Sequence, residues 1–338
     1  MVSRRKVFVT GIAGFLGSHL AESFLKLGYE VAGIDNLICG SEDNIPRGSL
    51  YRRADCNDIR SYIDLIHGSG LVYHCAATAY EGVSVFSPHF INTNVMNATS
   101  GVLSAAIQSG VKRFVHCSSM ARYGANEIPY AEHMTPRPVD PYGVSKYASE
   151  LMVINLCETH GLEFNIAIPH NIIGSRQKYD DPYRNVAAIF INRMLLGKQP
   201  IIYGDGLQKR CFSFIQDCLY CLKKLGVDPD IRNEIFNIGP DEEFISILDL
   251  AGIIAGLLDF KLEPIFIPED RPQEVKYAFC SADKARKLLG YKTRFTLRQG
   301  LEQMIADIRL RGPRDFAYNL NFEIINERTP ITWTNKLL

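Results

Sequence analysis

The sequence lacks the features that would tie it to a nucleic acid, a membrane or the secretory route. Its 37 lysines and arginines balance 37 aspartates and glutamates, so the formal net charge is +0 and neither a nucleic acid nor an anionic membrane is favoured as a partner. No apolar run approaches the roughly 20 residues that a membrane-spanning helix needs. The chain passes from Met1 into a strand-like run without the apolar core and cleavage site of a signal peptide. We therefore expect a cytoplasmic protein.

Cysteine patterns typical of disulfide frameworks or metal sites are also missing. The 9 cysteines are an odd number and are scattered along the chain. Cys218 and Cys221 come nearest to a functional pair, but they lie in a helix-like run with no second pair and no histidine partner. We interpret them as packing residues. Reduced thiols fit a cytoplasmic protein, and no metal site is predicted.

A glycine-rich turn near the N-terminus is the feature around which the remaining sequence is organised. The β-branched and aromatic run Val7–Val9 leads into Gly11, Gly14 and Gly17, and an amphipathic run of helical spacing follows. Gly11 permits the tight turn, Gly14 lets backbone N–H groups approach a diphosphate, and Gly17 lets the helix lie close to the sheet. The alternative is a turn with no ligand. The cofactor contacts predicted here are Gly11, Ala13, Gly14, Phe15, Leu16 and Gly17.

An acidic residue at the end of the next strand indicates which dinucleotide the turn would bind. Asp35 lies about 20 residues beyond the glycines, where a dinucleotide-binding unit places the carboxylate that holds the adenosine ribose. It favours NAD over NADP, because a carboxylate would repel a 2′-phosphate. Asp55, after a third short strand, is either a contact to the adenine amino group or the cap of a helix over 59–66. The neighbours assigned to the same site are Asn36 and Cys56.

Five strand-like runs alternate with helix-like runs in the first half of the chain, which predicts an α/β fold with a doubly wound parallel sheet. Two of these strands end in small residues, Ala76-Ala77 and Ser118-Ser119. Ligands of such sheets bind at the carboxyl ends of the strands, where the glycine turn and the two aspartates also fall. We expect His74, inside one of the strands, to be a packed residue rather than a ligand or a base.

A tyrosine and a lysine four residues apart supply the candidate chemistry. Tyr142 and Lys146 begin a helix that we expect to run to about residue 160, and the spacing places them on one face. A tyrosine with a pKa near ~10 is a poor base at neutral pH, but a nearby ammonium group lowers that pKa. Ser119 can hydrogen-bond the same substrate oxygen. The spacing alone is common on surface helices, and it gains weight because a dinucleotide turn and a Ser-Ser strand end precede it.

Together these motifs resemble the extended short-chain dehydrogenases/reductases, in their family of NAD-dependent sugar-nucleotide epimerases and dehydratases. The resemblance runs from about residue 6 to 310, and the G-x-x-G-x-x-G spacing is that family's own form. It implies a Rossmann domain over residues 1–175 that binds NAD and carries the catalytic residues. The matching positions are Thr10-Gly11, Gly14, Gly17, Asp35, Asp55, Ala76-Ala77, Asn94-Val95, the run Ser118–Gly124, Tyr142 and Lys146, with Asn94 and Ser118 as further cofactor contacts.

The resemblance also assigns roles at the reaction centre. It makes Tyr142 the base, Lys146 its pKa partner and the anchor of the nicotinamide ribose, and Ser119 the group that orients the hydroxyl. Members that resemble 4,6-dehydratases carry an Asp-Glu pair just after this serine, and UDP-glucuronate decarboxylases usually keep a glutamate there. This sequence has Met120 and Ala121, which have no proton to give. What remains is oxidation at C4 and return of the hydride, the reaction of a nucleotide-sugar 4-epimerase.

Substrate contacts are implied for a smaller lobe over residues 176–312, although the chain could cross back to the first domain. Tyr203 would contact a uracil ring, while Arg210 and Arg271 would bind the diphosphate, unless the arginines are ordinary surface residues. The other contacts expected of a UDP-linked sugar are Asn171, Asn185 and, at the ribose, Glu274.

Two further positions bear on the sugar and the chemistry. Ala278 stands four residues after the ribose acid, where a small side chain would leave room for an N-acetyl group; Tyr277, one position away, would reverse this expectation. His170 is either a second acid or base or, as we favour, a packing residue.

The last part of the chain, residues 313–338, is longer than the family usually has. Apolar residues alternate with polar ones from Phe316 to Ile324, which predicts a half-buried strand of no assigned function. The resemblance also implies a homodimer formed through helices at about 91–110 and 142–160.

Other functions stay open at this point. The nearest rivals are a nucleotide-sugar oxidoreductase, such as a 4-ketosugar reductase that releases its cofactor, and an epimerase of another UDP-sugar such as UDP-glucuronate. A rival of a different class is a non-catalytic NAD-binding regulatory protein with the same fold. The presence of Ser119, Tyr142 and Lys146 argues against this rival.

Overall fold

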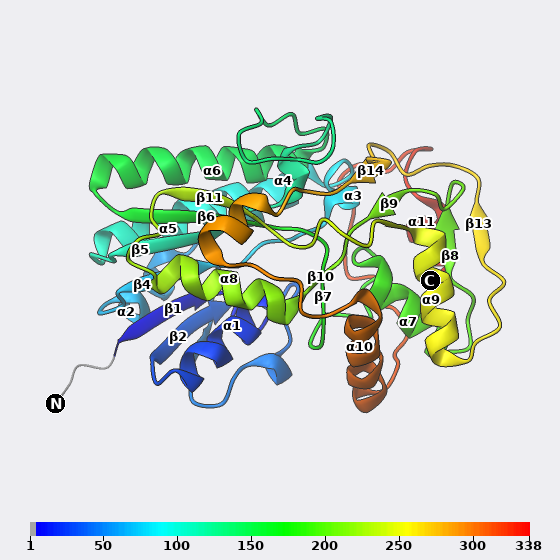
Figure 1. The fold of residues 1–338 in the computed structure, drawn as a ribbon, viewed down its shortest axis with the longest axis horizontal. Coiled ribbons are helices and arrows are strands. Elements are labelled where there is room, and N and C mark those ends of the chain that lie inside the picture. Colours follow the sequence, from blue (N-terminus) through cyan, green and yellow to red (C-terminus); the bar gives the residue numbers. More distant parts are fainter. Residues whose placement is uncertain (1–4) are drawn as a thin grey trace.

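A parallel sheet forms the core of the larger part of the molecule (Figure 1). The structure, a computed structural model, describes residues 5–338. Every neighbouring pair of strands in this seven-stranded sheet is parallel, which confirms the predicted doubly wound α/β class. In spatial order the strands are β11 (Glu234–Ile238), β6 (Glu163–Pro169), β5 (Arg113–Cys117), β4 (Leu71–His74), β1 (Lys6–Thr10), β2 (Glu30–Asp35) and β3 (Leu50–Arg53).

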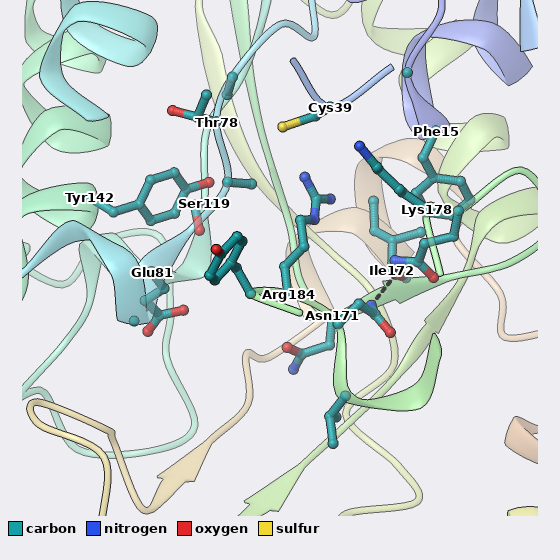
Figure 2. Close-up of a pocket in the computed structure, with 18 of the residues that line it drawn as sticks. Phe15, Cys39, Thr78, Glu81, Ser119, Tyr142, Asn171, Ile172, Lys178 and Arg184 are labelled. Carbon is teal, nitrogen blue, oxygen red and sulfur yellow. Dashed lines mark hydrogen bonds between the residues drawn. The ribbon is translucent and has the colours of Figure 1, made fainter. Parts of the chain in front are cut away.

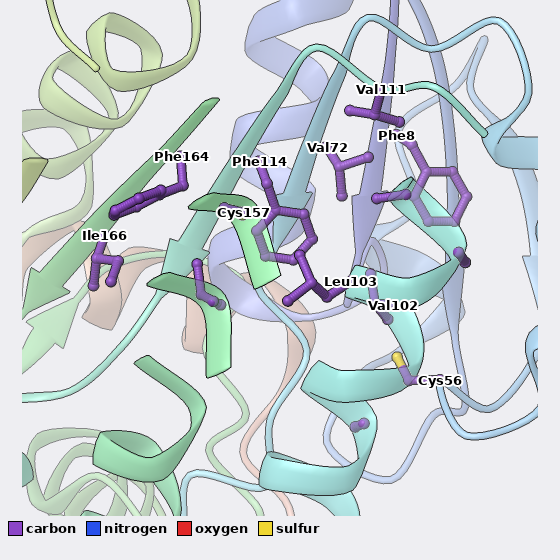
Figure 3. Packing of buried hydrophobic residues seen from close by; sticks show 14 of the residues in the cluster. Phe8, Cys56, Val72, Val102, Leu103, Val111, Phe114, Cys157, Phe164 and Ile166 are labelled. Carbon is purple, nitrogen blue, oxygen red and sulfur yellow. The ribbon is translucent and has the colours of Figure 1, made fainter. Parts of the chain in front are cut away.

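Helices cover both faces of this sheet because successive strand residues point to opposite sides. Val7 and Val9 pack on one face against α1 (Phe15–Lys26) and α8 (Ile215–Val227), where Cys218 and Cys221 are both buried, as expected of packing residues. Phe8 packs on the other face with Val72, Phe114 and residues of α2, α5 and α6 (Figure 3). These three helices are α2 (Ile63–Ile66), α5 (Ala98–Gln108) and α6 (Pro141–His160).

The helix that carries the Tyr-Lys pair has clear sequence signals at both ends. Asp140 caps α6 by accepting a hydrogen bond from the backbone N–H of Gly143 at 2.9 Å, and Pro141 occupies the first helical position. Gly161 ends the helix with a φ of 67°. The helix predicted over 91–110 begins earlier and contains a π turn; its parts are α4 (Pro88–Asn92), η3 (Thr93–Asn97) and α5.

A second, smaller lobe is built from three helices and three small sheets. The helices α7 (Val186–Leu195), α9 (Ile247–Leu258) and α10 (Leu297–Arg311) enclose its core. The chain crosses back to the large sheet between them, since α8 covers one face of that sheet and β11 is its edge strand. The small sheets are β7 (Ile172–Ile173) with β10 (Ser213–Phe214), β12 (Ile245–Ser246) with β9 (Lys209–Arg210) and β14 (Tyr277–Ala278), and β13 (Ile265–Ile267) with β8 (Ile201–Tyr203).

The predicted strand at residues 316–324 is wrong, because this segment is extended but is in no sheet. Its backbone N–H groups bond to loops instead: Ala317 donates to the carbonyl of Asp180 at 2.9 Å, and Ile324 donates to that of Phe86 at 2.9 Å. The alternation did predict burial, since Phe316 is buried and Phe322 packs against an aromatic cluster.

The remaining short helices connect these elements. They are η1 (Glu42–Asn44), η2 (Ile59–Ser61), α3 (Glu81–Ser84), η4 (Met120–Arg122), η5 (Ala285–Leu289) and α11 (Ile331–Thr334). Among residues 5–338, no helix is long and apolar enough to cross a bilayer.

Candidate active site

A cavity of about 470 Å³ lies at the carboxyl ends of the central strands and extends into the smaller lobe. The ends of β1, β2, β4 and β5 contribute one side of it, and loops and strands of the smaller lobe contribute the other. We refer to these as the cofactor end and the substrate end. Most of the site residues predicted from the sequence line this single cavity.

The glycine turn at the cofactor end has the geometry that its sequence predicts. Gly11 has a φ of 71°, a conformation that L side chains rarely adopt. A Cβ atom at Gly17 would overlap the carbonyl oxygen of Gly11, so only glycine lets α1 start this close to the turn. Gly11, Gly14, Phe15, Leu16 and Gly17 line the cavity, whereas Ala13 is buried behind it.

Asp35 is held in place by backbone donors. Its carboxylate accepts hydrogen bonds from the N–H groups of Ala13 at 3.1 Å and Leu37 at 2.8 Å. Burial raises the pKa of Asp35, and these hydrogen bonds partly oppose the shift. The role of Ala13 is therefore to position the aspartate.

Asp55 belongs to the same edge of the cavity. It accepts hydrogen bonds from the amide of Asn36 at 3.0 Å and from the backbone N–H of Asn57 at 2.8 Å. Burial alone would raise the pKa of Asp55, but these donors lower it overall. The alternative role as a helix cap is wrong, because η2 begins at Ile59 and its N-cap is Asp58. Cys56 lines the cavity beside it.

The ends of β4 and β5 complete the cofactor end. Ala76, Ala77 and Ser118 line the cavity, as does Asn94, whose amide donates to the carbonyl of Phe90 at 2.9 Å. His74 is the packed strand residue that we expected: its ring nitrogens lie 2.8 Å from the Thr10 hydroxyl and 3.0 Å from the Thr99 hydroxyl, and burial lowers its pKa to about 3.

Tyr142 and Ser119 face each other in the cavity (Figure 2), and Lys146 lines the same part of it, where its two ends join. The Lys146 ammonium donates to the carbonyl of Cys117 at 2.8 Å and lies 5.9 Å from the centre of the Tyr142 ring. Burial lowers the pKa of Lys146 to about 8. Burial raises the pKa of Tyr142, and the nearby Ser119 hydroxyl partly offsets that shift. The arrangement is a tyrosine that needs nearby positive charge to act as a base.

A buried acidic group lies one turn beyond the lysine. Glu150 accepts a hydrogen bond from the Ser118 hydroxyl and lies 3.2 Å from the guanidinium of Arg122. Both charged side chains are almost fully buried. Burial raises the pKa of Glu150 to about 7, against the opposing effect of Arg122. The Coulombic effect of Glu150 also raises the pKa of Lys146.

The arginines and the acid predicted for the substrate end do come together. Glu274 lies 3.1 Å from Arg271 and 3.7 Å from Arg210. Burial would raise the pKa of Glu274, but the two arginines lower it overall. The Arg271 guanidinium also lies 5.5 Å from the centre of the Tyr203 ring. These four residues line one wall of the cavity, so the arginines are not isolated surface residues.

Asn171 and Asn185 also line the cavity, and both have structural roles. The Asn171 amide donates to the carbonyl of Cys211 at 2.9 Å. Asn185 caps α7 by accepting from the N–H of Ala188 at 3.2 Å, so the N-terminus of a ten-residue helix faces the cavity. Such helix ends attract anionic groups.

Three of the residues singled out in the sequence lie outside the cavity. Ala278 is buried in the core that also contains Cys280, and Tyr277 is exposed beside Phe244, so neither lines the cavity. The expected link between Ala278 and an N-acetyl group has no support in this placement. His170 is buried with Nε2 3.0 Å from the carbonyl of Pro240, as the packing interpretation predicted.

Three charged residues that line the cavity were missed by the sequence analysis: Arg184 and Glu81 near Tyr142, and Lys178 beside Phe15 and Cys39 at the cofactor end. Lys178 and Arg184 project into the cavity, and their side chains form no hydrogen bond or ion pair with any other residue among 5–338 (Figure 2). Glu81, from α3, faces the same space, and burial together with the charge of Asp140 raises its pKa to about 7. The one available signal was proximity in sequence, since Arg184 precedes Asn185 and Glu81 follows the Ala76-Ala77 strand end.

The cofactor end fits a dinucleotide. A turn that needs glycine at two places, a buried carboxylate beside it and small residues at the next strand ends form a cradle that larger side chains would fill. Asp35 fits a ribose diol and would repel a 2′-phosphate, which selects NAD. Within residues 5–338, there is no group of three or more side chains suited to hold a metal ion.

Comparisons with known proteins agree with this arrangement. The family described as "NAD dependent epimerase/dehydratase family" matches residues 7–239. A putative UDP-glucose 4-epimerase of Methanocaldococcus jannaschii is 32% identical over 306 residues, covering 88% of this chain and 97% of that protein. A UDP-N-acetyl-alpha-D-glucosaminuronate decarboxylase of Bacillus cytotoxicus is 28% identical over 321 residues, covering 89% of this chain and 97% of that protein.

A solved structure shares the whole architecture. The UDP-glucuronic acid 4-epimerase of Bacillus cereus, in complex with UDP-glucuronic acid and NAD, superposes with a TM-score of 0.83 at 29% identity, covering 91% of this chain and 100% of its own. The fold, the glycine turn with its ribose carboxylate and these similarities agree. This chain therefore belongs to the NAD-dependent epimerase/dehydratase family of extended short-chain dehydrogenases/reductases, and its cofactor is NAD.

Proposed function

We propose that the protein is a nucleotide-sugar 4-epimerase that acts on a UDP-linked hexose. The observation that carries the proposal is the composition of the reaction centre. Tyr142 and Ser119 face the cavity together, whereas Met120 and Ala121, which follow that serine, have no ionisable group. Members of this family that resemble dehydratases carry an acid there, and decarboxylases usually do, whereas C4 oxidation and hydride return need none.

In this proposal, each residue of the reaction centre has a separate role. NAD, when bound, supplies the acceptor and the donor of the hydride at C4 of the sugar. Tyr142 takes the proton of the 4-hydroxyl and later returns one, and Ser119 orients the same oxygen. Lys146, fixed by its hydrogen bond to the Cys117 carbonyl, places the positive charge that favours the phenolate of Tyr142.

Inversion at C4 requires the sugar to present both faces to the same tyrosine. The nucleotide must stay bound while the sugar turns about its diphosphate linkage. The wall formed by Arg210, Arg271, Glu274 and Tyr203 supports this role, because charge-assisted hydrogen bonds would hold the diphosphate and ribose away from the reacting carbon.

One measurement tests this proposal directly. Purified protein, with no cofactor added, is incubated with UDP-glucose, UDP-N-acetylglucosamine and UDP-glucuronate, and proton NMR follows the sugar H4 signal. A change between axial and equatorial H4 supports epimerisation with a retained cofactor and identifies the sugar. If no sugar changes while added NADH is consumed with a 4-keto sugar, the protein is a reductase instead.

An anionic sugar is the second candidate, and Arg184 favours it, because its guanidinium forms no hydrogen bond or ion pair among residues 5–338. A hexuronate carries a carboxylate beyond the two charges of the diphosphate, and Arg184, near Tyr142, is available to bind it. The Arg184→Met variant separates the two cases by its kcat/KM on each sugar. A uronate epimerase loses much more activity on UDP-glucuronate than on UDP-glucose, whereas a hexose epimerase shows no such selective loss.

The assembly is proposed to be a homodimer. Val144 and Leu151, two turns apart on α6, are 52% and 50% exposed. They lie on the helix that packs beside α4 and α5, where the relatives' dimer surface was expected. Sedimentation equilibrium of wild type and of a Leu151→Glu variant tests this: we expect a dimer and a monomer, respectively.

A further inference from the structure

The last 26 residues, 313–338, form a strap across the substrate end of the cavity. The family match ends at residue 239, so this segment is outside it. The strap is anchored along its length. The carboxylate of Glu323 accepts from the backbone N–H groups of His89 at 2.9 Å and Phe90 at 2.7 Å, at the start of α4. Arg193 of α7 donates to the carbonyl of Leu337 at 3.0 Å.

Aromatic side chains of the strap pack against one another and against the loop that carries Tyr183. Trp333 stacks on Phe322 with ring centres 5.6 Å apart and meets Tyr183 edge-on at 5.7 Å. Its indole N–H donates to the carbonyl of Pro182 at 3.2 Å. A Cβ at Gly82 would lie 3.4 Å from its ring, beside Glu81. The contacts bury Trp333 and fix α11 against the loop that carries Arg184.

One hydroxyl of the strap contacts the wall of the cavity that Arg210, Arg271, Glu274 and Tyr203 form. Thr332, Trp333 and Leu338 line the cavity. The Thr332 hydroxyl lies 2.5 Å from the hydroxyl of Tyr203, the residue expected to meet the base. Among residues 5–338, this is the one side-chain hydrogen bond of the Tyr203 hydroxyl, and Thr332 is almost fully buried.

We propose that the strap is part of the substrate site and that Thr332 is a positioning residue, which holds Tyr203 in the orientation that binds the nucleotide base. The inference rests on the proposed function, because it takes a uridine nucleotide as the ligand. A tyrosine with a free hydroxyl could rotate about its side-chain torsions, and ordering it would then oppose binding. The hydrogen bond between Tyr203 and the buried Thr332 removes that freedom before the ligand arrives.

The test is a binding measurement that does not depend on the reaction. UDP is titrated by calorimetry into the NAD-loaded protein and into the Thr332→Val variant, which keeps the shape of the side chain and loses its hydroxyl. We expect the Kd for UDP to rise by about 3- to 10-fold, the effect of one net hydrogen bond. Thr334→Val, an exposed threonine of the same helix, is the matched control and leaves the Kd unchanged.

A double-mutant cycle identifies the bond itself. Tyr203→Phe removes the other hydroxyl, so the double variant should bind UDP no more weakly than the weaker single variant. Strict additivity of the two effects overturns the assignment of Thr332 as the partner of Tyr203. The kcat of the Thr332→Val variant should stay within about 2-fold of wild type, because Thr332 does not touch the reaction centre.

The single tryptophan of the chain gives an independent readout. Because Trp333 is in the strap and lines the cavity, its emission should change when UDP binds. Suppose that wild-type protein binds UDP in the calorimeter, that its Trp333 emission does not change, and that the Thr332→Val variant has the same Kd for UDP. This result overturns the strap proposal and leaves the proposed function standing. Wild-type protein that does not bind UDP contradicts the proposed UDP-sugar function and this inference with it.

Discussion

The two ends of the cavity are built in different ways. At the cofactor end, each group lies at or within two residues of the carboxyl end of its own strand in one sheet, as Gly11, Asp35 and Ala76 do. At the substrate end, the groups come from segments far apart in the chain, such as Glu81, Arg271 and the strap. The cofactor end is therefore specified by short stretches of sequence, and the substrate end is specified by how those stretches pack.

The two ends also differ in how their charges are satisfied. The Asp35 carboxylate already has backbone donors, so the cofactor end is organised before any ligand binds. The Arg184 side chain forms no hydrogen bond or ion pair among residues 5–338, so the substrate end presents positive charge that a bound anion would neutralise. Substitutions at the two ends should consequently change different quantities: cofactor content at one end and KM at the other.

The largest loss of activity is expected for a substitution at the point where the two ends of the cavity join. Tyr142→Phe removes the proton acceptor, and kcat for the UDP-sugar identified by NMR should fall by about 10³-fold, within the range for loss of a general base. The NAD content of the purified protein should stay the same, because the ring and Lys146 remain. Tyr147→Phe, in the same helix beyond Lys146, is the control. A Tyr142→Phe protein with more than a tenth of the wild-type rate would exclude Tyr142 as the base.

The next largest effect tests the cofactor end alone. In Gly17→Ala the new Cβ would overlap the Gly11 carbonyl oxygen, so either the turn or α1 has to move. We expect the purified protein to retain less than about a tenth of the wild-type NAD, measured after acid release, and to lose about 1–3 kcal/mol of unfolding free energy through strain.

A glycine with open surroundings is the control for that substitution. Gly252 is exposed within α9, and a Cβ added there would have no atom within 4 Å beyond its own helix backbone and chain neighbours. Gly252→Ala should keep its NAD and gain up to about 1 kcal/mol in stability from helix propensity. Full NAD content in Gly17→Ala would contradict the close approach at the turn.

The cofactor end could be predicted from the sequence because interactions between residues close in the chain determine its structure. A strand followed by a turn with glycines and a helix has few ways to pack, and parallel strands bring their carboxyl ends to one edge. Asp35 and Asp55 could therefore be placed with no knowledge of the rest of the chain. His74 could be interpreted as a packed residue for the same reason, since a strand interior satisfies it with neighbouring hydroxyls.

The substrate end could be predicted only in part, because long-range packing decides it. Nothing near Ala278 in the sequence reveals that a two-residue strand pairs with β9 and turns this side chain into the core. The alternation from Phe316 correctly indicated an inward face, but a strand also needs a free edge to pair with. Among residues 5–338 this segment pairs with no strand, and its backbone bonds to the Asp180 and Phe86 carbonyls instead.

A prediction at the substrate end follows from its unpaired charge. Arg184→Met should raise KM for the UDP-sugar by about 10-fold or more, the loss expected for a charge-assisted hydrogen bond, and should leave NAD content unchanged. Arg328→Met, an exposed arginine of the strap, is the control and should have wild-type kinetics. An unchanged KM in Arg184→Met would mean that the free cation at this end does not meet the substrate.

The smallest predicted effect concerns Glu150, which acts on the reaction centre through Lys146. Lys146 must be protonated to favour the Tyr142 phenolate, and its pKa of about 8 sets the pH above which that support is lost. The carboxylate of Glu150 raises the pKa of Lys146, so Glu150→Gln should lower it. The alkaline limb of the kcat/KM profile should then move to lower pH by about half a unit.

The same substitution separates a positioning role from a structural one. Glu150→Gln keeps an acceptor for the Ser118 hydroxyl but leaves the buried Arg122 without its counter-charge, so the free energy of unfolding should also fall, by about 3 kcal/mol. A purely structural effect would lower stability at every pH and leave the alkaline limb in place, whereas an electrostatic effect moves the limb. Glu158→Gln, exposed two turns further along α6, should change neither quantity.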